Sequence, residues 1–276
     1  MRYSADDASA FLRKSAPIAK RQSPCERAAM SKLMVLSTLA AYGHCRPVEI
    51  NAACFGSRSG LRMTQRCLRH LVESGEVKPC RNPVGSTSFV LTHIGARTLE
   101  LRGLPGKHGL DIRSVSGATF IHHSLTSRYV IEKKLRGWDA FTEFGIGAGL
   151  APISTSALRA RFQKTPDGVL IDKKADRLFL IEVECAFKPL DKIMAILSLA
   201  NLVGARAHAD LPYVFAGLVL VYAEPSHAAR IERAARLLWS ERGPEQATLA
   251  SRVILSKVDV SLPLVWRDFT ETPLAL

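Results

Sequence analysis

The sequence predicts a two-domain protein, in which a basic, helix-rich α+β domain comes first and an α/β domain, a mixed sheet flanked by helices, follows. The 276 residues exceed the usual size of one domain, and 47% of them are apolar, which is enough for two cores. Residues 1–115 contain 18 Lys and Arg against 8 Asp and Glu, whereas the remainder contains 20 against 17. The hydrophobic pattern also changes, from helical spacing at first to strands alternating with helices after about residue 118.

Composition excludes a membrane-spanning or secreted protein. The longest apolar stretches, residues 179–183 and 214–222, are much shorter than the roughly 20 residues that a spanning helix needs. Residues 1–22 have neither the apolar centre nor the cleavage site of a secretory signal. We therefore expect a cytoplasmic protein with no membrane partner.

The chain begins with an expected flexible basic arm over residues 1–23, followed by three helices. Apolar residues at helical spacing over 26–41, with Pro24 before them and Gly43 after them, predict the first helix. A short second helix is expected over 48–55. Ser59 is a candidate cap for the third helix.

The third helix is predicted to have two different faces. Leu61, Thr64, Leu68, Leu71 and Val72 recur on one side and are expected to pack. The opposite side, by steps of three and four residues, carries Arg62, Gln65, Arg66 and Arg69. After this helix we expect a hairpin, with strands over 76–78 and 87–92 and a turn over 81–86, and then a helix over 94–101 capped by Thr92.

This order of elements over residues 24–104 resembles the winged helix-turn-helix domain. The resemblance implies that the third helix enters the major groove of double-stranded DNA with Arg62, Gln65, Arg66 and Arg69 near bases and phosphates, and that Arg81 in the wing contacts the backbone. The concentration of positive charge favours DNA. Winged helices also bind proteins, and an arginine face can be merely solvated, so both alternatives stay open.

Residues 105–118, rich in glycine, are expected to form a linker to a second domain over 119–276. The elements expected in that domain are a helix over 121–135, a strand over 140–146, strands over 168–171 and 178–185, a helix over 189–202, a strand over 213–222, a helix over 227–240 and one or two strands within 251–265.

Three carboxylates of this domain are candidate metal ligands. The strands over 168–171 and 178–185 are expected to form a hairpin, and strand alternation places Glu182 and Glu184 on one face. Asp167, at the mouth of the preceding strand, joins them if the hairpin is in register. Three hard oxygen donors suit Mg²⁺ or Mn²⁺, which would also relieve the repulsion between the acids. Lys188, just beyond the strand, is the candidate cation for orienting water or neutralising phosphate.

Pro166, Asp167, Glu182 and a lysine, within this order of helix, strand, hairpin, helix and strand, resemble the PD-(D/E)XK or restriction-endonuclease-like superfamily. Within it the chain, over residues 24–265, is most similar to the replication-relaxation proteins, which join a winged helix to such a domain and assist plasmid mobilisation. The resemblance implies a metal-dependent DNA nuclease with Asp167, Glu182, Glu184 and Lys188 at its centre. The superfamily usually has lysine where this chain has Glu184.

Three functions are therefore compatible with the sequence. The first is an accessory of plasmid or integrative-element mobilisation or replication that also cleaves DNA. The second is a non-catalytic DNA-binding regulator whose degenerate nuclease-like domain forms a homodimer or docks a relaxase or another transfer protein. The third is a restriction-type endonuclease. Of the other polar side chains, Glu132 is expected to be exposed, and His122 and His123 to cap or pack.

Overall fold

The computed structural model describes residues 23–56, 61–110, 112–113, 115–207, 212–243, 245–261 and 265–276. The chain forms two compact units. The first unit comprises Met1–Val115 with Phe144–Ser154, and the second comprises Ser116–Glu143 with Thr155–Leu276. Of the expected basic arm, only Ser23 is among the described residues. Ser59, the expected cap of the third helix, also lies outside the described residues.

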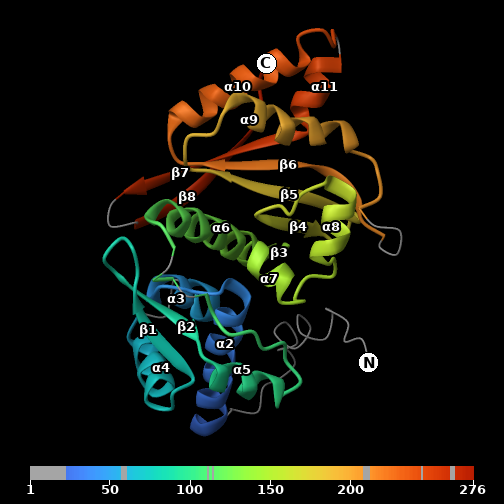
Figure 1. Cartoon of the computed structure of the whole chain (residues 1–276). Coiled ribbons are helices and arrows are strands. Elements are labelled where there is room, and N and C mark those ends of the chain that lie inside the picture. Colours follow the sequence, from blue (N-terminus) through green and yellow to red (C-terminus); the bar gives the residue numbers. More distant parts are fainter. Residues whose placement is uncertain are drawn as a thin grey trace. The chain divides into compact units, whose positions relative to one another are not determined.

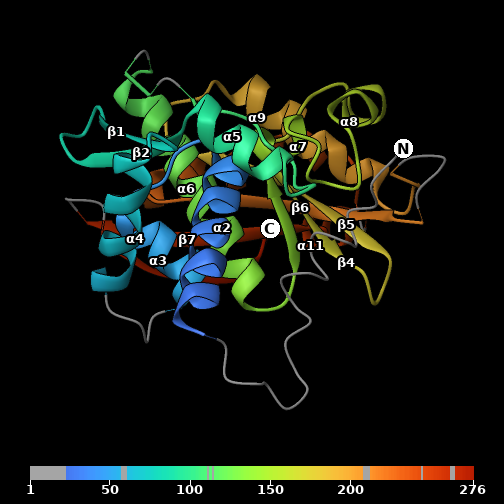
Figure 2. The ribbon, with the colours of Figure 1, turned by 90° about the horizontal axis from the view of Figure 1, so that it is seen from below.

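The first unit contains three helices, a hairpin and a further helix, in the predicted order. Their bounds are α2 (Pro24–Tyr42), α3 (Pro47–Phe55), α4 (Leu61–Glu73), β1 (Val77–Arg81), β2 (Thr87–Leu91) and α5 (His93–Glu100), and β1 and β2 pair antiparallel. Helix α2 contacts α3, α4, α5 and β2 and so lies at the centre of this unit (Figure 2).

Local signals in the sequence explain where these helices begin and end. Ser23 accepts a hydrogen bond from the Glu26 backbone N–H, and Glu26 accepts one from the Ser23 N–H, a capping box. Gly43 ends α2 with φ of +77°, a conformation that glycine adopts without strain. Thr92 caps α5 as predicted, by accepting from the Gly95 N–H.

The segment expected as a linker does not behave as one over residues 105–110 and 112–113. The Gly109 N–H donates to the Leu91 carbonyl, and Ile112 is fully buried against Cys80 and Val90. A Cβ at Gly109 would lie 2.4 Å from the carbonyl oxygen of Gly43. The glycine that suggested a linker is therefore required for close packing, and the chain first passes from one unit to the other after Val115.

The second unit is built on a mixed six-stranded sheet. Its elements are α6 (Gly117–Leu135), β3 (Asp139–Thr142), α8 (Thr155–Phe162), β4 (Gly168–Asp172), β5 (Arg177–Glu184), α9 (Leu190–Leu197), the 3₁₀ helix η1 (Ser198–Leu202), β6 (Val214–Tyr222), α10 (Pro225–Trp239), α11 (Glu245–Ser251), β7 (Val253–Ser261) and β8 (Val265–Pro273). The strand order is β3-β4-β5-β6-β7-β8, parallel across β5-β6-β7 and antiparallel elsewhere.

Helices cover both faces of this sheet, which explains why its central strands are almost wholly apolar. Helix α6 lies on one face, and α9, α10 and α11 lie on the other (Figure 1). Strands β5 and β6 are buried along most of their length, as expected for parallel strands covered on both sides. The mixed sheet flanked by helices is confirmed.

The expected elements differ from the structure mainly where helices are short. The strand expected over 140–146 ends at Thr142, and α7 (Glu143–Gly147) follows it. Helices α8 and α11 were not predicted, because seven or eight residues give too few turns for a clear period. No helix among the described residues is long and apolar enough to cross a membrane.

Candidate functional site

Three acidic residues lie next to one another at the same end of β3, β4 and β5. They are Glu143, Asp167 and Glu182, and we call them the acidic row. The Glu143 N–H donates to the Asp167 carbonyl at 2.8 Å, which extends the pairing of β3 with β4 by one residue. Gly168 pairs with Ile181, so the next residues outward, Asp167 and Glu182, stand opposite each other. Directly opposed residues project from the same face of a sheet. The predicted hairpin of β4 and β5 is confirmed, and its register, continued outward by one residue, brings Asp167 level with Glu182.

Glycine at position 168 permits this arrangement. A Cβ there would lie 2.6 Å from the backbone oxygen of Phe141 on β3. Any larger residue would push β3 and β4 apart immediately beside Asp167, so Gly168 helps to hold the acidic row together.

Asp167 is held as a charged partner of His122. One oxygen of Asp167, Oδ2, accepts from the Val183 N–H at 2.8 Å and lies 3.0 Å from His122 Nε2, on α6. Burial acts to raise the pKa of Asp167, but the hydrogen bond and charge of His122 and the Val183 N–H lower it below its ordinary value. Burial acts in turn to lower the pKa of His122, but Asp167 outweighs it and raises that pKa.

Glu182 is buried, and only one of its oxygens has a hydrogen-bond partner. Lys164 Nζ donates to Oε2 at 2.5 Å, whereas Oε1 has none among the residues that the structure describes. Burial and then the charge of Asp167 raise the pKa of Glu182 to about 7, against the opposing effect of Lys164. This acid therefore exchanges its proton close to neutral pH.

Glu184 is also buried, but a different cation holds it. Lys188 Nζ donates to Glu184 Oε1 at 2.6 Å, four residues along the chain. The predicted cluster of Asp167, Glu182 and Glu184 is thus divided, because each acid contacts its own cationic side chain, His122, Lys164 or Lys188.

The donor set bears on whether Mg²⁺ or Mn²⁺ fits here. No three His, Cys, Asp or Glu side chains in the described part of the chain form a ready metal-binding group. Asp167 and Glu182 nevertheless share a level of the sheet, and Glu182 Oε1 is buried without a partner. Magnesium is usually held by one or two carboxylates and completes its shell with water and substrate phosphate. Asp167 and Glu182 suit such an ion, and Glu184 does not join them.

Sequence reasoning missed three residues of this site. Glu143 was expected within a strand, and its pKa is raised by burial and by Asp167. Lys164 lies only three residues before Asp167, so its proximity could have indicated it. His122 is 45 residues from Asp167 in the chain, and no local pattern connects them. Glu132, expected to be exposed, is instead buried and paired with Arg136.

The predicted division of the third helix into two faces holds from Thr64 onward, whereas Leu61, which was expected to pack, is exposed at the start of α4. Thr64, Leu68 and Leu71 are buried, and the side chains on the other face are exposed: Arg62, Gln65, Arg66 and Arg69. Among the described residues, no ion pair engages the three arginines of this set. Arg81 is also exposed, at the end of β1. We call these four α4 residues the α4 polar face.

Comparison of the chain with protein-family models, curated proteins and solved structures gives no match.

Proposed function

We propose that this chain binds double-stranded DNA through the α4 polar face of its first unit and hydrolyses a phosphodiester bond at the acidic row of its second unit. The first unit then acts as a winged helix-turn-helix, with α4 in the major groove and Arg81 at the backbone. The resemblance to replication-relaxation proteins suggests plasmid mobilisation or replication as the setting. The observation that carries the hydrolytic part is the opposition of Asp167 and Glu182 beside Lys164.

Asp167 and Glu182 of the acidic row, and Lys164 beside them, each have a role that follows from their contacts. Asp167, kept ionised by His122, offers carboxylate oxygen to a divalent cation, and the partnerless Oε1 of Glu182 offers a second donor. Mg²⁺ or Mn²⁺, when bound, supplies positive charge for the phosphate and makes water more acidic. Lys164 supplies a protein cation at the same place, which allows it to contact a phosphate oxygen.

Lys164 offers a substitute for a lysine that the superfamily pattern usually contains and this chain lacks at that position. That pattern usually has lysine two residues after the acidic strand residue, where this chain has Glu184. Lys164 contacts Glu182, the acid level with Asp167, from the segment between α8 and β4, whereas Lys188 contacts Glu184, which does not join that pair. We infer that Lys164, rather than Lys188, performs the role of the superfamily lysine.

Cleavage of supercoiled and linear DNA in a titration of Mg²⁺ and Mn²⁺ tests the proposal. We expect metal-dependent cleavage that Asp167→Ala and Glu182→Ala each reduce more than about a hundredfold, a typical loss for a catalytic acid or base. Asp172→Ala is the matched control, because Asp172 is an aspartate at the other end of β4, paired with Arg177. It should cleave like the natural protein.

A second candidate function is a DNA-binding regulator that does not cleave. The observation that favours it is the pairing of Glu182 and Glu184 with lysines, which stabilises the acids without a metal. In that case DNA binding persists, neither metal produces cleavage, and the second unit serves as a dimerisation or docking domain for a relaxase.

A further inference from the structure

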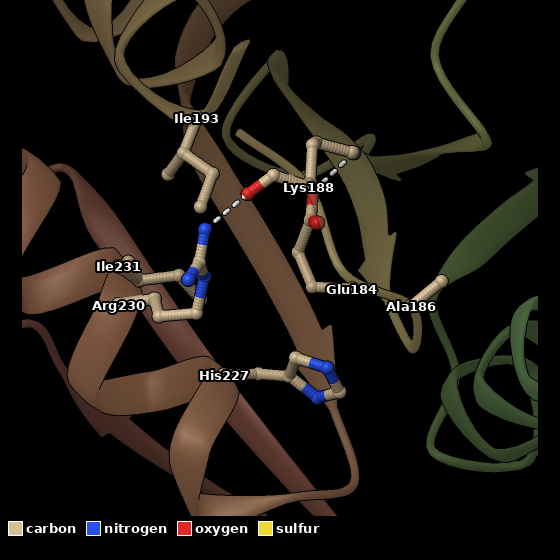
Figure 3. Close-up of a pocket in the computed structure, with 7 residues that line it drawn as sticks. All are labelled: Glu184, Ala186, Lys188, Ile193, His227, Arg230 and Ile231. Carbon is tan, nitrogen blue, oxygen red and sulfur yellow. Dashed lines mark hydrogen bonds and ion pairs between the residues drawn. The ribbon is translucent and has the colours of Figure 1, made fainter. Parts of the chain in front are cut away.

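A pocket beside the acidic row is lined by positive charge. It lies at the end of β5 and between the starts of α9 and α10, and it has no interior space large enough for a water molecule. Its lining residues are Glu184, Ala186, Lys188, Ile193, His227, Arg230 and Ile231 (Figure 3). Its lining carries Lys188 and Arg230 against Glu184 alone. An anionic group therefore meets a net positive charge there before His227 is counted.

Hydrogen bonds hold the side chains of Arg230, on α10, and Lys188, after β5, in place. Arg230 Nη2 donates to the Lys188 carbonyl at 2.6 Å, and Lys188 Nζ donates to Glu184 at 2.6 Å (Figure 3). Each bond uses one N–H group, so the single ammonium nitrogen of Lys188 and the guanidinium of Arg230 both have further N–H groups to donate. His227, also from α10, has a buried Nδ1 without a hydrogen-bond partner among the described residues. The pocket thus offers donors for an oxyanion.

An exposed aromatic ring stands next to these cations. Phe187 is 78% exposed, the most exposed large apolar side chain in the described part of the chain. The Arg230 guanidinium carbon lies 4.1 Å from the centre of its ring, which supports the ring on one side. The pocket has no room for a phosphate group inside it, so a phosphate would lie across its mouth against Arg230 and Lys188, and the base of the same nucleotide would lie outside, beside Phe187.

We propose that Phe187, Arg230, Lys188 and His227 form a surface subsite for one unpaired nucleotide of single-stranded DNA, with the phosphate at the mouth of the pocket against the cations and the base stacked on Phe187. Cations beside an aromatic platform are the usual means of holding unpaired nucleotides without sequence preference. The subsite deepens the proposed function and rests on it, because it specifies DNA with an unpaired strand at the acidic row as the substrate. Lys188 connects the two sites, since its charge acts on Glu182 as well.

Photo-crosslinking of the full chain tests the subsite. A duplex with a single-stranded overhang carrying 5-iododeoxyuridine is irradiated in EDTA, and the crosslinked peptide is identified by mass spectrometry. We expect a crosslink at Phe187. Phe187→Ala should remove it and weaken overhang binding about tenfold, the usual scale for one stacked base, whereas Phe187→Trp should retain binding. Leu237→Ala, which removes an exposed apolar side chain from α10, is the control.

Two further variants test the phosphate contact. Arg230→Ala should weaken overhang binding and lower its salt dependence, whereas Arg236→Ala, an exposed arginine farther along α10, should leave both unchanged. A crosslink elsewhere, or equal binding by Phe187→Ala and the natural protein, overturns the subsite. So does tighter binding of an RNA overhang of the same sequence.

Blunt duplex binding is measured in parallel, so that failure of the subsite is distinguishable from failure of the proposed function. Duplex binding without any crosslink at Phe187 removes the subsite and leaves the proposed function intact. If the natural protein does not bind blunt duplex, the proposed role of the α4 polar face is contradicted.

Discussion

The two units of this protein use charge in opposite ways. On the α4 polar face, arginines extend into solvent and no ion pair among the described residues engages them. In the acidic row, the carboxylates of Asp167 and Glu182 are largely withdrawn from water and each contacts a cation. Exposed charge acts over a distance and is screened by salt. Buried charge is costly unless it is paired, and it shifts proton affinities. The first arrangement suits attraction of a polyanion, and the second suits chemistry on one phosphate.

If the two units use charge independently, each should have its own core, and substitution of Ile112 should have the largest effect on the core of the first unit. Ile112→Ala removes a fully buried side chain from the cluster with Cys80 and Val90 and should lower the free energy of unfolding of the first unit by about 3 kcal/mol. Hydrogen exchange should show the loss in α2 to α5 and not in the sheet of the second unit. Val84→Ala, on the more exposed hairpin turn, should change little; an equally small effect of Ile112→Ala would mean that residues 105–115 are a linker after all.

Lys164 and Lys188 should differ in how much each contributes to the rate of DNA cleavage. Lys164→Ala should reduce DNA cleavage about a hundredfold, the usual scale for removing one group that stabilises developing charge. Lys188→Ala should reduce cleavage of blunt duplex less than tenfold, because its amine contacts Glu184, which lies outside the pair of Asp167 and Glu182. Rates are compared at saturating DNA, so that binding is excluded. The reverse order of the two variants would assign the superfamily lysine to position 188.

Some parts of this arrangement could be predicted from the sequence because they depend on neighbours in the chain. The faces of α4 follow from the 3.6-residue period, and the opposition of Asp167 and Glu182 follows from a hairpin with a short turn. The contacts of His122 and Glu143 with Asp167 depend instead on how α6 and β3 pack, which no local pattern encodes. Position 109 shows a further limit, because a glycine in a turn-like stretch has the same appearance whether it joins domains or allows two segments to touch.

The proton affinity of Glu182 provides a smaller test. Its pKa rises from an ordinary 4.5 to about 7 on folding, so the folded state holds a proton that the unfolded chain has lost. Stability should therefore fall as pH rises from about 4.5 to about 7, by on the order of 2 kcal/mol. Glu182→Gln should reduce the slope of this part of the profile in denaturant unfolding, measured in EDTA so that no divalent ion competes with protons. The slope that remains belongs to Glu143 and His122, whose pKa values are also raised.

Asp172→Asn is the control for this measurement. The hydrogen bond from Arg177 lowers the pKa of Asp172 below 3.8, so its contribution to stability is present above that pH and is lost as pH falls. The Asp172→Asn profile should differ from that of the natural protein only in acid. A slope between pH 4.5 and 7 that is undiminished in Glu182→Gln would place the responsible proton elsewhere.

The smallest expected effects belong to the exposed arginines, because each contributes one screened contact. Arg66→Ala and Arg69→Ala should each weaken duplex binding by about tenfold or less, and each lost phosphate contact should reduce the slope of log affinity against log salt by about 0.9. Arg97→Ala, on α5 and paired with Glu100, should leave that slope unchanged. A loss that is equal on all DNA sequences indicates phosphate contact, whereas a loss on a preferred sequence alone indicates base recognition. Unchanged affinity and slope in both α4 variants would instead leave DNA binding to another surface, because the helix would then be solvated and not engaged.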